Sequence, residues 1–279
     1  MIEHTLDATK RIGVGRTAEI YAWGEGRALR LFRDGASIEY ALREMQAFRV
    51  AHDAGLPCPA VYPFDDSEDG LVRIGGRIGF VMDRVGGPSM LATLSRRPWL
   101  LMRYARRFAD LHLMVHSRSV TSLPSQRLRF ERVIERIQAD VGDDIAAGIR
   151  EALRQMPDGD SVCHGDFHPD NVLLDPAGPV IIDWGPATSG NPAADIAWTK
   201  YLFRHAGAPP DTAWWQRPII LALRHAFFAA YRHAYARGAS VDWQEVRAWA
   251  PVIAAVRLGD RIAEERDLLL AILRRHFGR

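Results

Sequence analysis

Three side chains with proton- and metal-binding oxygens stand close together in the second half of the chain. Asp166 and Asn171 are five residues apart in the segment CHGDFHPDNVLL, and Asp183 follows twelve residues later in IIDWG. Phosphoryl transfer needs a carboxylate that accepts or orients the proton of an attacking hydroxyl, and hard oxygen ligands for a cation that bridges the phosphates. The residue types and their spacing therefore indicate phosphoryl-transfer chemistry.

The segment between Asn171 and Asp183 predicts the element that positions them. The apolar residues 172–174 and 180–182 flank a turn, Asp-Pro-Ala-Gly, at 175–178, which favours a hairpin. The open end of that hairpin would bring Asn171 and Asp183 together. An amide oxygen and a carboxylate there suit Mg²⁺ with water and phosphate oxygens as its other ligands.

The spacing is that of the protein-kinase catalytic loop, in which an Asp is followed five residues later by an Asn and then by a metal-binding Asp. Here the loop is His-Gly-Asp instead of His-Arg-Asp, and Trp-Gly follows Asp183. The segments HGDFHPDN and IDWG resemble the aminoglycoside phosphotransferase family, whose fold is kinase-like. The resemblance implies Asp166 as catalytic base, Asn171 and Asp183 as magnesium ligands, and ATP as phosphoryl donor, with GTP as the alternative.

A glycine pair near the N-terminus adds independent support. Residues 13–20, GVGRTAEI, fit the pattern G-x-G-x-x-A-x-I, which is the kinase Gly-rich loop with Ala18 at the third glycine. Gly13 and Gly15 would let the backbone approach phosphate, and Ile20 would cover the base. Ordinary turn glycines are the alternative interpretation of this short pattern.

The following strand and helix predict a basic residue and its partner. The family's phosphate-contacting basic position maps to Arg30 instead of Lys. Arg neutralises phosphate, but its planar fork is not a Lys point charge. The helix expected at 36–54 supplies Glu44 as the partner of Arg30, with Glu39 as the alternative.

The resemblance also assigns the remaining nucleotide contacts. The segment 81–85, just before Gly86-Gly87, falls at the hinge, and Met82, Asp83 and Val85 are expected to read the adenine edge through backbone groups. Leu173 would form the apolar floor beneath the base. Asp195, in the stretch NPAAD, is expected to tie the catalytic loop and cap a helix.

The order of elements predicts an α+β, bilobal, protein-kinase-like fold. Residues 1–85 read as a small β-rich nucleotide-binding lobe, and 86–279 as a large helical lobe with the catalytic loop and substrate site. At 48% hydrophobic and 25% charged residues, the composition is that of a globular enzyme. The two cysteines are in no metal-ligand spacing, and no apolar stretch is long enough to span a bilayer, so we expect a cytoplasmic protein.

Other functions compete with a kinase. Arg30 in place of Lys motivates a pseudokinase that binds nucleotide as an interaction module. The alternating residues His164, Asp166, His168 and Asp170 are transition-metal ligand types and raise a metal-dependent hydrolase, which leaves Asn171, Asp183 and the glycines unexplained. A protein kinase is disfavoured, because few residues separate Asp183 from the stretch at 191–195.

The C-terminal region bears on the substrate. From residue 200 onward there are thirteen Lys plus Arg against seven Asp plus Glu, which gives a formal charge of +6. A neutral or anionic alcohol fits this region at least as well as a polycation. The expected partner is a small hydroxylated substrate, with no nucleic acid and no membrane, and the protein is expected to be a monomer or homodimer. The tryptophans of this region and the run 218–223 are expected in the core.

Overall fold

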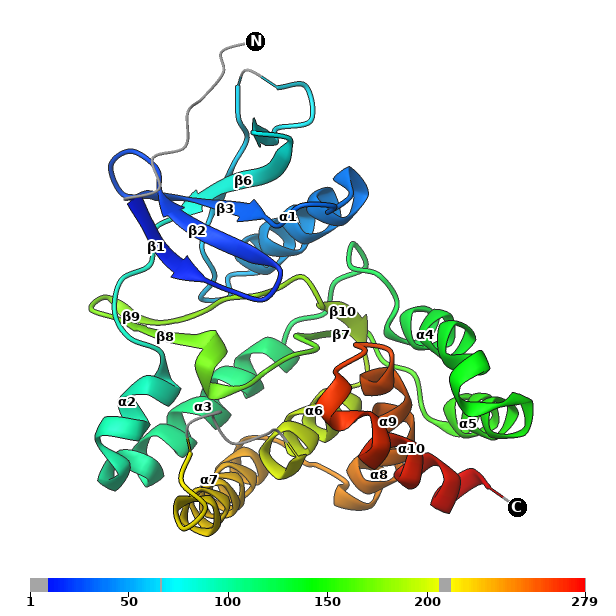
Figure 1. Cartoon of the computed structure of the whole chain (residues 1–279). Helices are drawn as coiled ribbons and strands as arrows, with labels where there is room; N and C mark the ends of the chain where they lie inside the picture. The colour runs from blue at the N-terminus through cyan, green and yellow to red at the C-terminus, as the bar shows by residue number, and fades with distance from the viewer. Residues whose placement is uncertain (1–9, 66, 206–211, 279) are drawn as a thin grey trace. The chain divides into compact units, whose positions relative to one another are not determined.

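The computed structural model describes residues 10–65, 67–205 and 212–278, and these form two compact units (Figure 1). The first unit contains Met1–Thr93 and Asp170–Pro186, and the second contains Leu94–Pro169 and Ala187–Arg279. The segment with Asn171 and Asp183 thus groups with the N-terminal residues, whereas Asp166 belongs to the second unit. The division at residues 85 and 86 stays a prediction.

The first unit is built on an antiparallel sheet. Its strand order is β1-β2-β3-β6-β4, and β5 pairs with β6. The bounds are β1 Arg11–Val14, β2 Ala18–Ala22, β3 Arg27–Phe32, β4 Val61–Tyr62, β5 Val72–Ile74 and β6 Arg77–Asp83. Helix α1, Ile38–Asp53, begins after Ser37, whose side chain accepts a hydrogen bond from the Tyr40 N–H. One face of α1, including Met45 and Phe48, is buried, as its three- and four-residue apolar spacing predicts.

The hairpin predicted around the turn at 175–178 is present. Strands β8, Val172–Asp175, and β9, Gly178–Ile181, pair from Val172 opposite Ile181 to Asp175 opposite Gly178. One residue beyond this register, the Ile182 N–H donates to the Asn171 carbonyl at 3.0 Å. The open end of the hairpin therefore holds Asn171 next to the residue that precedes Asp183.

The second unit is helical apart from one small sheet. Strands β7, Ser161–Cys163, and β10, Thr188–Gly190, pair antiparallel beside the catalytic loop. The helices are α3 Leu101–His116, α4 Gln126–Val141, α5 Asp143–Gln155, α6 Pro192–His205, α7 Gln216–Gly238, α8 Trp243–Ala248, α9 Ala250–Leu258 and α10 Ala263–Phe277; α2, Met90–Arg96, crosses the boundary between the units, and short 3-10 turns occupy Pro98–Leu100 and Pro169–Asn171.

An aromatic core joins α3 to α7 and to the catalytic loop. The Phe108 ring stacks on Phe167 with centroids 4.3 Å apart, and it meets Phe227 and Tyr231 edge-on. Stacked and edge-on aromatic pairs contribute roughly 0.5–1.5 kcal/mol beyond the burial of their surface. The packing of Phe167 in this core therefore fixes the backbone next to Asp166.

Helices α4 and α5 are separate, because Gly142 adopts a φ of 87° and ends α4. Two expectations about burial in the helical region are wrong. The run 218–223 is not core: Ile219, Leu221 and Leu223 are 52%, 43% and 39% exposed.

Trp249 is buried as expected, but Trp214 and Trp215 are 81% and 54% exposed. They precede the first residue of α7, so helical spacing does not apply to them. Among the described residues no helix is both long and apolar enough to cross a membrane.

Candidate active site

Arg30 stands at the centre of a charged cluster within the first unit. Its Nε lies 2.5 Å from Glu44 Oε1, and its terminal nitrogen lies 3.1 Å from Asp183 Oδ1. Strand β3 supplies Arg30, α1 supplies Glu44, and the end of the hairpin supplies Asp183. The structure thus pairs Arg30 with Glu44, the partner preferred from the sequence, and not with Glu39.

This cluster is shielded from water on the Glu44 side. The side chains of Glu44 and Arg30 are 1% and 11% exposed, whereas that of Asp183 is 37% exposed. Burial raises the pKa of the Glu44 carboxyl, and the charge of Arg30 opposes that rise. A Cβ at Gly185 would approach Glu44 Oε2 to 2.9 Å, so only glycine leaves room for Glu44 at this position.

Asn171 and Asp183 are the two residues predicted to bind a metal. Asn171 is 7% exposed, and Asp183 adopts a φ of 63°, which is uncommon for a residue other than glycine. Such backbone strain is retained where the surrounding structure fixes it, often at functional sites. An amide oxygen and a partly exposed carboxylate fit the hard-oxygen preference of Mg²⁺.

The glycine loop connects β1 to β2 in a tight turn. The Gly15 N–H donates to the Ala18 carbonyl at 2.8 Å, and Arg33 donates to the carbonyls of Gly15 and Arg16 at 2.9 and 3.0 Å. Gly13 lies opposite Ile20 in the β1–β2 register. The loop is therefore held through its carbonyls by Arg33.

The predicted hinge, residues 81–85, begins within the last residues of β6. Asp83 is engaged in the structure: its N–H donates to the Ala60 carbonyl, and its carboxylate accepts from the Ala60 N–H at 2.9 Å and from the Tyr62 hydroxyl at 2.8 Å. Adenine recognition by the Asp83 N–H is thereby excluded in this conformation. The roles of Met82 and Val85 stay predictions.

Leu173 lies on the hairpin that packs against the residues after the hinge. It is half-buried and forms a bridge with Ser89, and the Leu174 N–H donates to the Pro88 carbonyl at 2.9 Å. Gly87, with a φ of 82°, allows this approach, since a Cβ there would lie 2.1 Å from the Leu174 carbonyl oxygen. The hairpin is therefore in direct contact with the residues that follow the hinge segment, and the role of Leu173 beneath a base stays a prediction.

Asp166 lies in the second unit, in the loop after β7. Its Oδ1 accepts from the Trp198 indole N–H at 3.2 Å, and its Oδ2 lies 3.5 Å from His168 Nε2. Burial would raise the pKa of the Asp166 carboxyl, but His168, His164 and the Trp198 donor together lower it to about 2. The carboxylate is therefore ionised at neutral pH and can accept a hydrogen bond from a hydroxyl.

Asp195 fixes the backbone of this loop. Its two carboxylate oxygens accept from the N–H groups of His164 and Gly165 at 2.7 and 2.8 Å. The predicted tie to the catalytic loop is confirmed, but Asp195 does not cap α6. Asn191 does so, because its side chain accepts from the Ala193 N–H at 2.8 Å.

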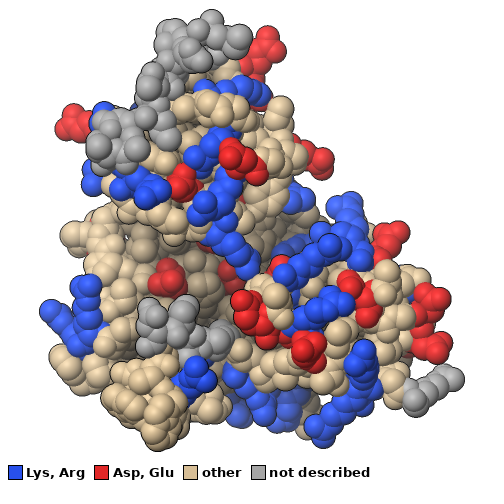
Figure 2. All heavy atoms as spheres, in the orientation of Figure 1, with Lys and Arg blue, Asp and Glu red and all other residues tan. Residues whose placement is uncertain are grey.

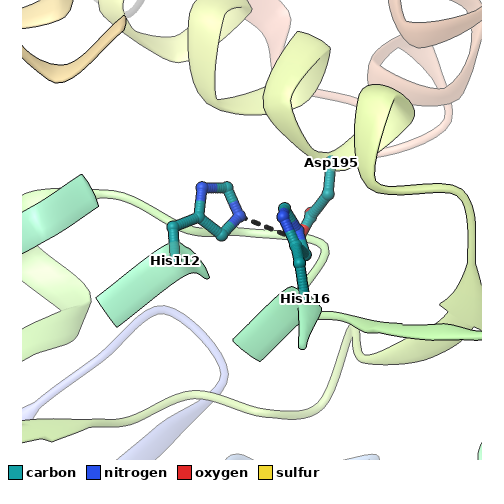
Figure 3. Close-up of side chains that lie close together, drawn as sticks. All are labelled: His112, His116 and Asp195. Atoms are coloured by element: carbon teal, nitrogen blue, oxygen red, sulfur yellow. Dashed lines mark hydrogen bonds and ion pairs between the residues drawn. The ribbon is translucent and has the colours of Figure 1, made fainter. Parts of the chain in front are cut away.

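The histidines His112 and His116 of α3 also contact Asp195 (Figure 3). The Nε2 atom of each lies 3.1 Å from Asp195 Oδ2. Burial lowers the pKa of His112 to about 3, so its ring is neutral. Among the described residues these three are the one group of three or more His, Cys, Asp or Glu side chains close enough to share a metal ion, and the cluster at 164–170 is not such a group.

Sequence reasoning missed Trp198 and a buried network behind it. Arg257 makes two 2.7 Å contacts with the carboxylate of Glu265, which also accepts from the Tyr201 hydroxyl at 3.0 Å. Its guanidinium lies 5.8 Å from the Trp198 ring. No motif marks these residues, although Tyr231 and Tyr235 on α7 repeat the four-residue spacing of His112 and His116.

Comparisons with known proteins identify the family and the fold of the chain. The model of the phosphotransferase enzyme family matches residues 9–249. Apo aminoglycoside phosphotransferase APH(4)-Ia, a thermostable mutant, superposes with a TM-score of 0.61 at 17% identity, covering 96% of this chain and 94% of its own. No curated protein sequence matches.

Two further solved structures share the fold. Amicoumacin kinase hAmiN, in complex with AMP-PNP, Ca²⁺ and its ligand, has a TM-score of 0.61 at 12% identity, covering 99% of this chain and 90% of its own. Macrolide 2'-phosphotransferase MphH from Brachybacterium faecium has a TM-score of 0.53 at 17% identity, covering 96% and 93%.

The similar structures confirm the kinase-like fold, and the family model confirms the expectation of a phosphotransferase. Because the family model covers most of the sequence, the chain belongs to the phosphotransferase enzyme family.

Proposed function

We propose that the protein transfers the γ-phosphoryl group of ATP to a hydroxyl of a small molecule in a Mg²⁺-dependent reaction. The observation that carries the proposal is the cluster of Arg30, Glu44 and Asp183 at the hairpin end that also holds Asn171. A buried carboxylate orients a cation there, and a partly exposed carboxylate is held in a strained conformation beside it. This is the charge pattern that phosphate and a divalent cation require.

Each residue has a distinct role in the proposed reaction. Asn171 and Asp183 would hold Mg²⁺, which when bound neutralises the charge of the phosphates. Arg30 offsets charge that develops on the transferred group. Asp166 accepts the hydrogen bond of the substrate hydroxyl, whose oxygen attacks phosphorus as the bond to the β-phosphate oxygen breaks.

The acidity of Asp166 specifies how it assists. A carboxylate with a pKa of about 2 is a weak base for an alcohol proton. The transition state of phosphoryl transfer is loose, and the hydroxyl loses its proton late. Asp166 therefore mainly orients the nucleophile and takes up the proton once the new bond to phosphorus has largely formed.

The substrate proposed for this site is a neutral or anionic alcohol. The region from residue 200 onward carries a formal charge of +6, which disfavours a polycation. Figure 2 shows acidic and basic side chains intermixed over α9 and α10, so no strongly acidic surface covers that part of the visible face. The solved relatives act on hygromycin B, amicoumacin and macrolides by their names, and these classes define the first compounds to test.

The test is ATP consumption across hydroxylated metabolites and antibiotics, with Asp166→Asn as the inactive variant. We expect that variant to retain nucleotide binding and to lose phosphoryl transfer by a factor of about 10³ or more. Asp170→Asn, in the same loop with an exposed side chain, is the matched control and should keep activity. Full activity of Asp166→Asn would refute the assignment.

A pseudokinase is the second candidate, and Arg30 is the observation that favours it. In the structure Arg30 is bound to Asp183, one of the proposed metal ligands. If this pair persists with nucleotide present, Asp183 is not available to Mg²⁺. Nucleotide binding that is insensitive to Mg²⁺, with no turnover on any compound, would support this candidate.

A further inference from the structure

Two parallel side-chain arms reach Asp195 from α3 and α7. In the first, the Tyr231 hydroxyl lies 2.8 Å from His112 Nδ1; in the second, the Tyr235 hydroxyl lies 2.6 Å from His116 Nδ1. Both histidines end on the same oxygen, Asp195 Oδ2 (Figure 3).

The chemistry of the groups fixes the direction of these hydrogen bonds. Asp195 is ionised, because the hydrogen bonds from His112 and His116 outweigh its burial and keep its pKa well below the usual range. A carboxylate only accepts, so each Nε2–H donates to Oδ2. The ring of His112 is neutral, so its Nδ1 accepts from the Tyr231 hydroxyl.

Asp195 thus accepts hydrogen bonds from two kinds of donor, the histidine side chains and the backbone of the catalytic loop. Oδ2 accepts from His112, from His116 and from the His164 N–H, while Oδ1 accepts from the Gly165 N–H. The histidines therefore determine the plane of the carboxylate that holds the backbone just before Asp166. A buried carboxylate deprived of one donor turns toward another or admits water, since the loss of a hydrogen bond to a charged group is costly.

The two arms differ in their access to solvent. A cavity of about 560 Å³ is lined by α3, α6, α7 and the residues before α8, and His116 and Tyr235 are among its lining residues. His112 and Tyr231 are not. His112 is fully buried, whereas His116 is 9% exposed. The volume is within the usual range for small-molecule sites, so a compound of the size of imidazole has room beside His116.

We propose that His116 is a positioning residue for phosphoryl transfer, and that the cavity beside it lets a small neutral nitrogen heterocycle reach the position of its ring. The inference rests on the proposed function for its kinetic consequence. Its structural consequence is the protection of the His164 and Gly165 amides from hydrogen exchange, which does not depend on any substrate.

The first experiment uses chemical rescue. His116→Gly should lower kcat about tenfold, leave the KM for ATP within about twofold, and speed amide exchange at His164 and Gly165 about tenfold. Imidazole at millimolar concentration should restore both readouts by entering the space of the missing ring through the cavity.

The matched control is His112→Gly, which removes the same bond to Asp195 from the arm that does not line the cavity. We expect His112→Gly to lower kcat and speed amide exchange about as much as His116→Gly does, and imidazole to restore neither. A second control adds Val241→Trp to His116→Gly, because Val241 lines the cavity and the larger side chain should block rescue. Equal rescue of both histidine variants would overturn the role of the cavity.

Two variants that keep most of the volume of the His116 side chain test the same role if the glycine variants fold poorly. His116→Gln retains a donor and should keep kcat and amide exchange within about threefold of the wild type. His116→Leu has similar volume without a donor and should behave as His116→Gly does. If His116→Leu leaves both amides within about twofold of wild-type exchange, the positioning role is refuted.

A metal ion is the competing explanation for two histidines and an aspartate within 4.8 Å. Metal binding needs both Nε2 lone pairs, which the hydrogen-bonded arrangement assigns to N–H donors. Stoichiometric Zn²⁺ binding to the wild-type protein that is lost in His116→Gln would therefore overturn the proposal. Inactivity of the wild type on all compounds, with exchange and rescue as expected, would instead refute only the proposed function.

Discussion

The ion pair between Arg30 and Glu44 provides the sharpest test of the first unit. Glu44→Gln keeps the shape of the side chain and removes its charge. Arg30 then retains only Asp183, at 3.1 Å, as a charged partner. Because Arg30 is 11% exposed, its guanidinium cannot turn into water without moving the strand that carries it.

The expected cost follows from the burial of the pair. Unit charges roughly 4 Å apart attract by about 4 kcal/mol at an effective dielectric constant of about 20. Removing one partner of a buried pair costs about 3–5 kcal/mol, and the remaining bond to Asp183 places this case near the lower limit. At about 2 °C per kcal/mol for a chain of this size, we expect the melting temperature to fall by about 6 °C.

Thermal unfolding followed by circular dichroism, with and without ATP and Mg²⁺, measures this effect. Glu39→Gln is the matched control, because Glu39 is exposed on the same helix and its substitution should change stability by less than about 0.5 kcal/mol. The double variant Arg30→Met with Glu44→Leu should recover stability to within about 1 kcal/mol and lose nucleotide binding. A melting temperature of Glu44→Gln within about 1 °C of the wild type would contradict the reasoning.

Three further outcomes follow from single contacts. The pKa of Asp166 is lowered to about 2 from an ordinary value of 3.8, so its contribution to stability is present above pH 4 and is lost as the pH falls through 2. When the pH is lowered from above 4 to below 2, the unfolding free energy should therefore decrease by about 2 kcal/mol less in Asp166→Asn than in the wild type. Trp198→Phe removes a donor to Asp166 and should move the acid limb of the pH–rate profile to higher pH, with no movement if the 3.2 Å bond is absent in solution. Gly87→Ala should destabilise by more than about 2 kcal/mol in chemical denaturation, because its Cβ would meet the Leu174 carbonyl oxygen, whereas Gly76→Ala has a similar φ and open space and should cost about 1 kcal/mol.

The sequence predicted the parts of the site that depend on local spacing. The hairpin follows from two apolar runs around a turn, and its register brings Asn171 beside Ile182 without reference to any other element. Glu44 was named through the resemblance as the partner of Arg30, and the structure buries it on α1 together with Met45 and Phe48. Local periodicity therefore specifies which side chains a single element can present.

Contacts between elements distant in sequence could not be read in the same way. Trp198 donates to Asp166 across thirty-two residues, and the tyrosine arms join α3 to α7 across 119 residues. No spacing rule links such positions. The exposed run 218–223 shows the converse, since apolar composition predicts burial only where another element covers that helix face.

The structure gives the two proposed catalytic carboxylates opposite kinds of support. Asp183 has a strained backbone, with a φ of 63°, and it forms an ion pair with Arg30. Arg30 can also bind phosphate. Asp166 instead lies on a backbone fixed by Asp195, which is saturated by four donors. An ion pair with a single shared cation can exchange partners when nucleotide binds, whereas a carboxylate with four hydrogen bonds resists displacement. We therefore expect the proposed metal ligand Asp183 to be the more adaptable of the two carboxylates, and Asp166, proposed to orient the nucleophile, to be the more rigid.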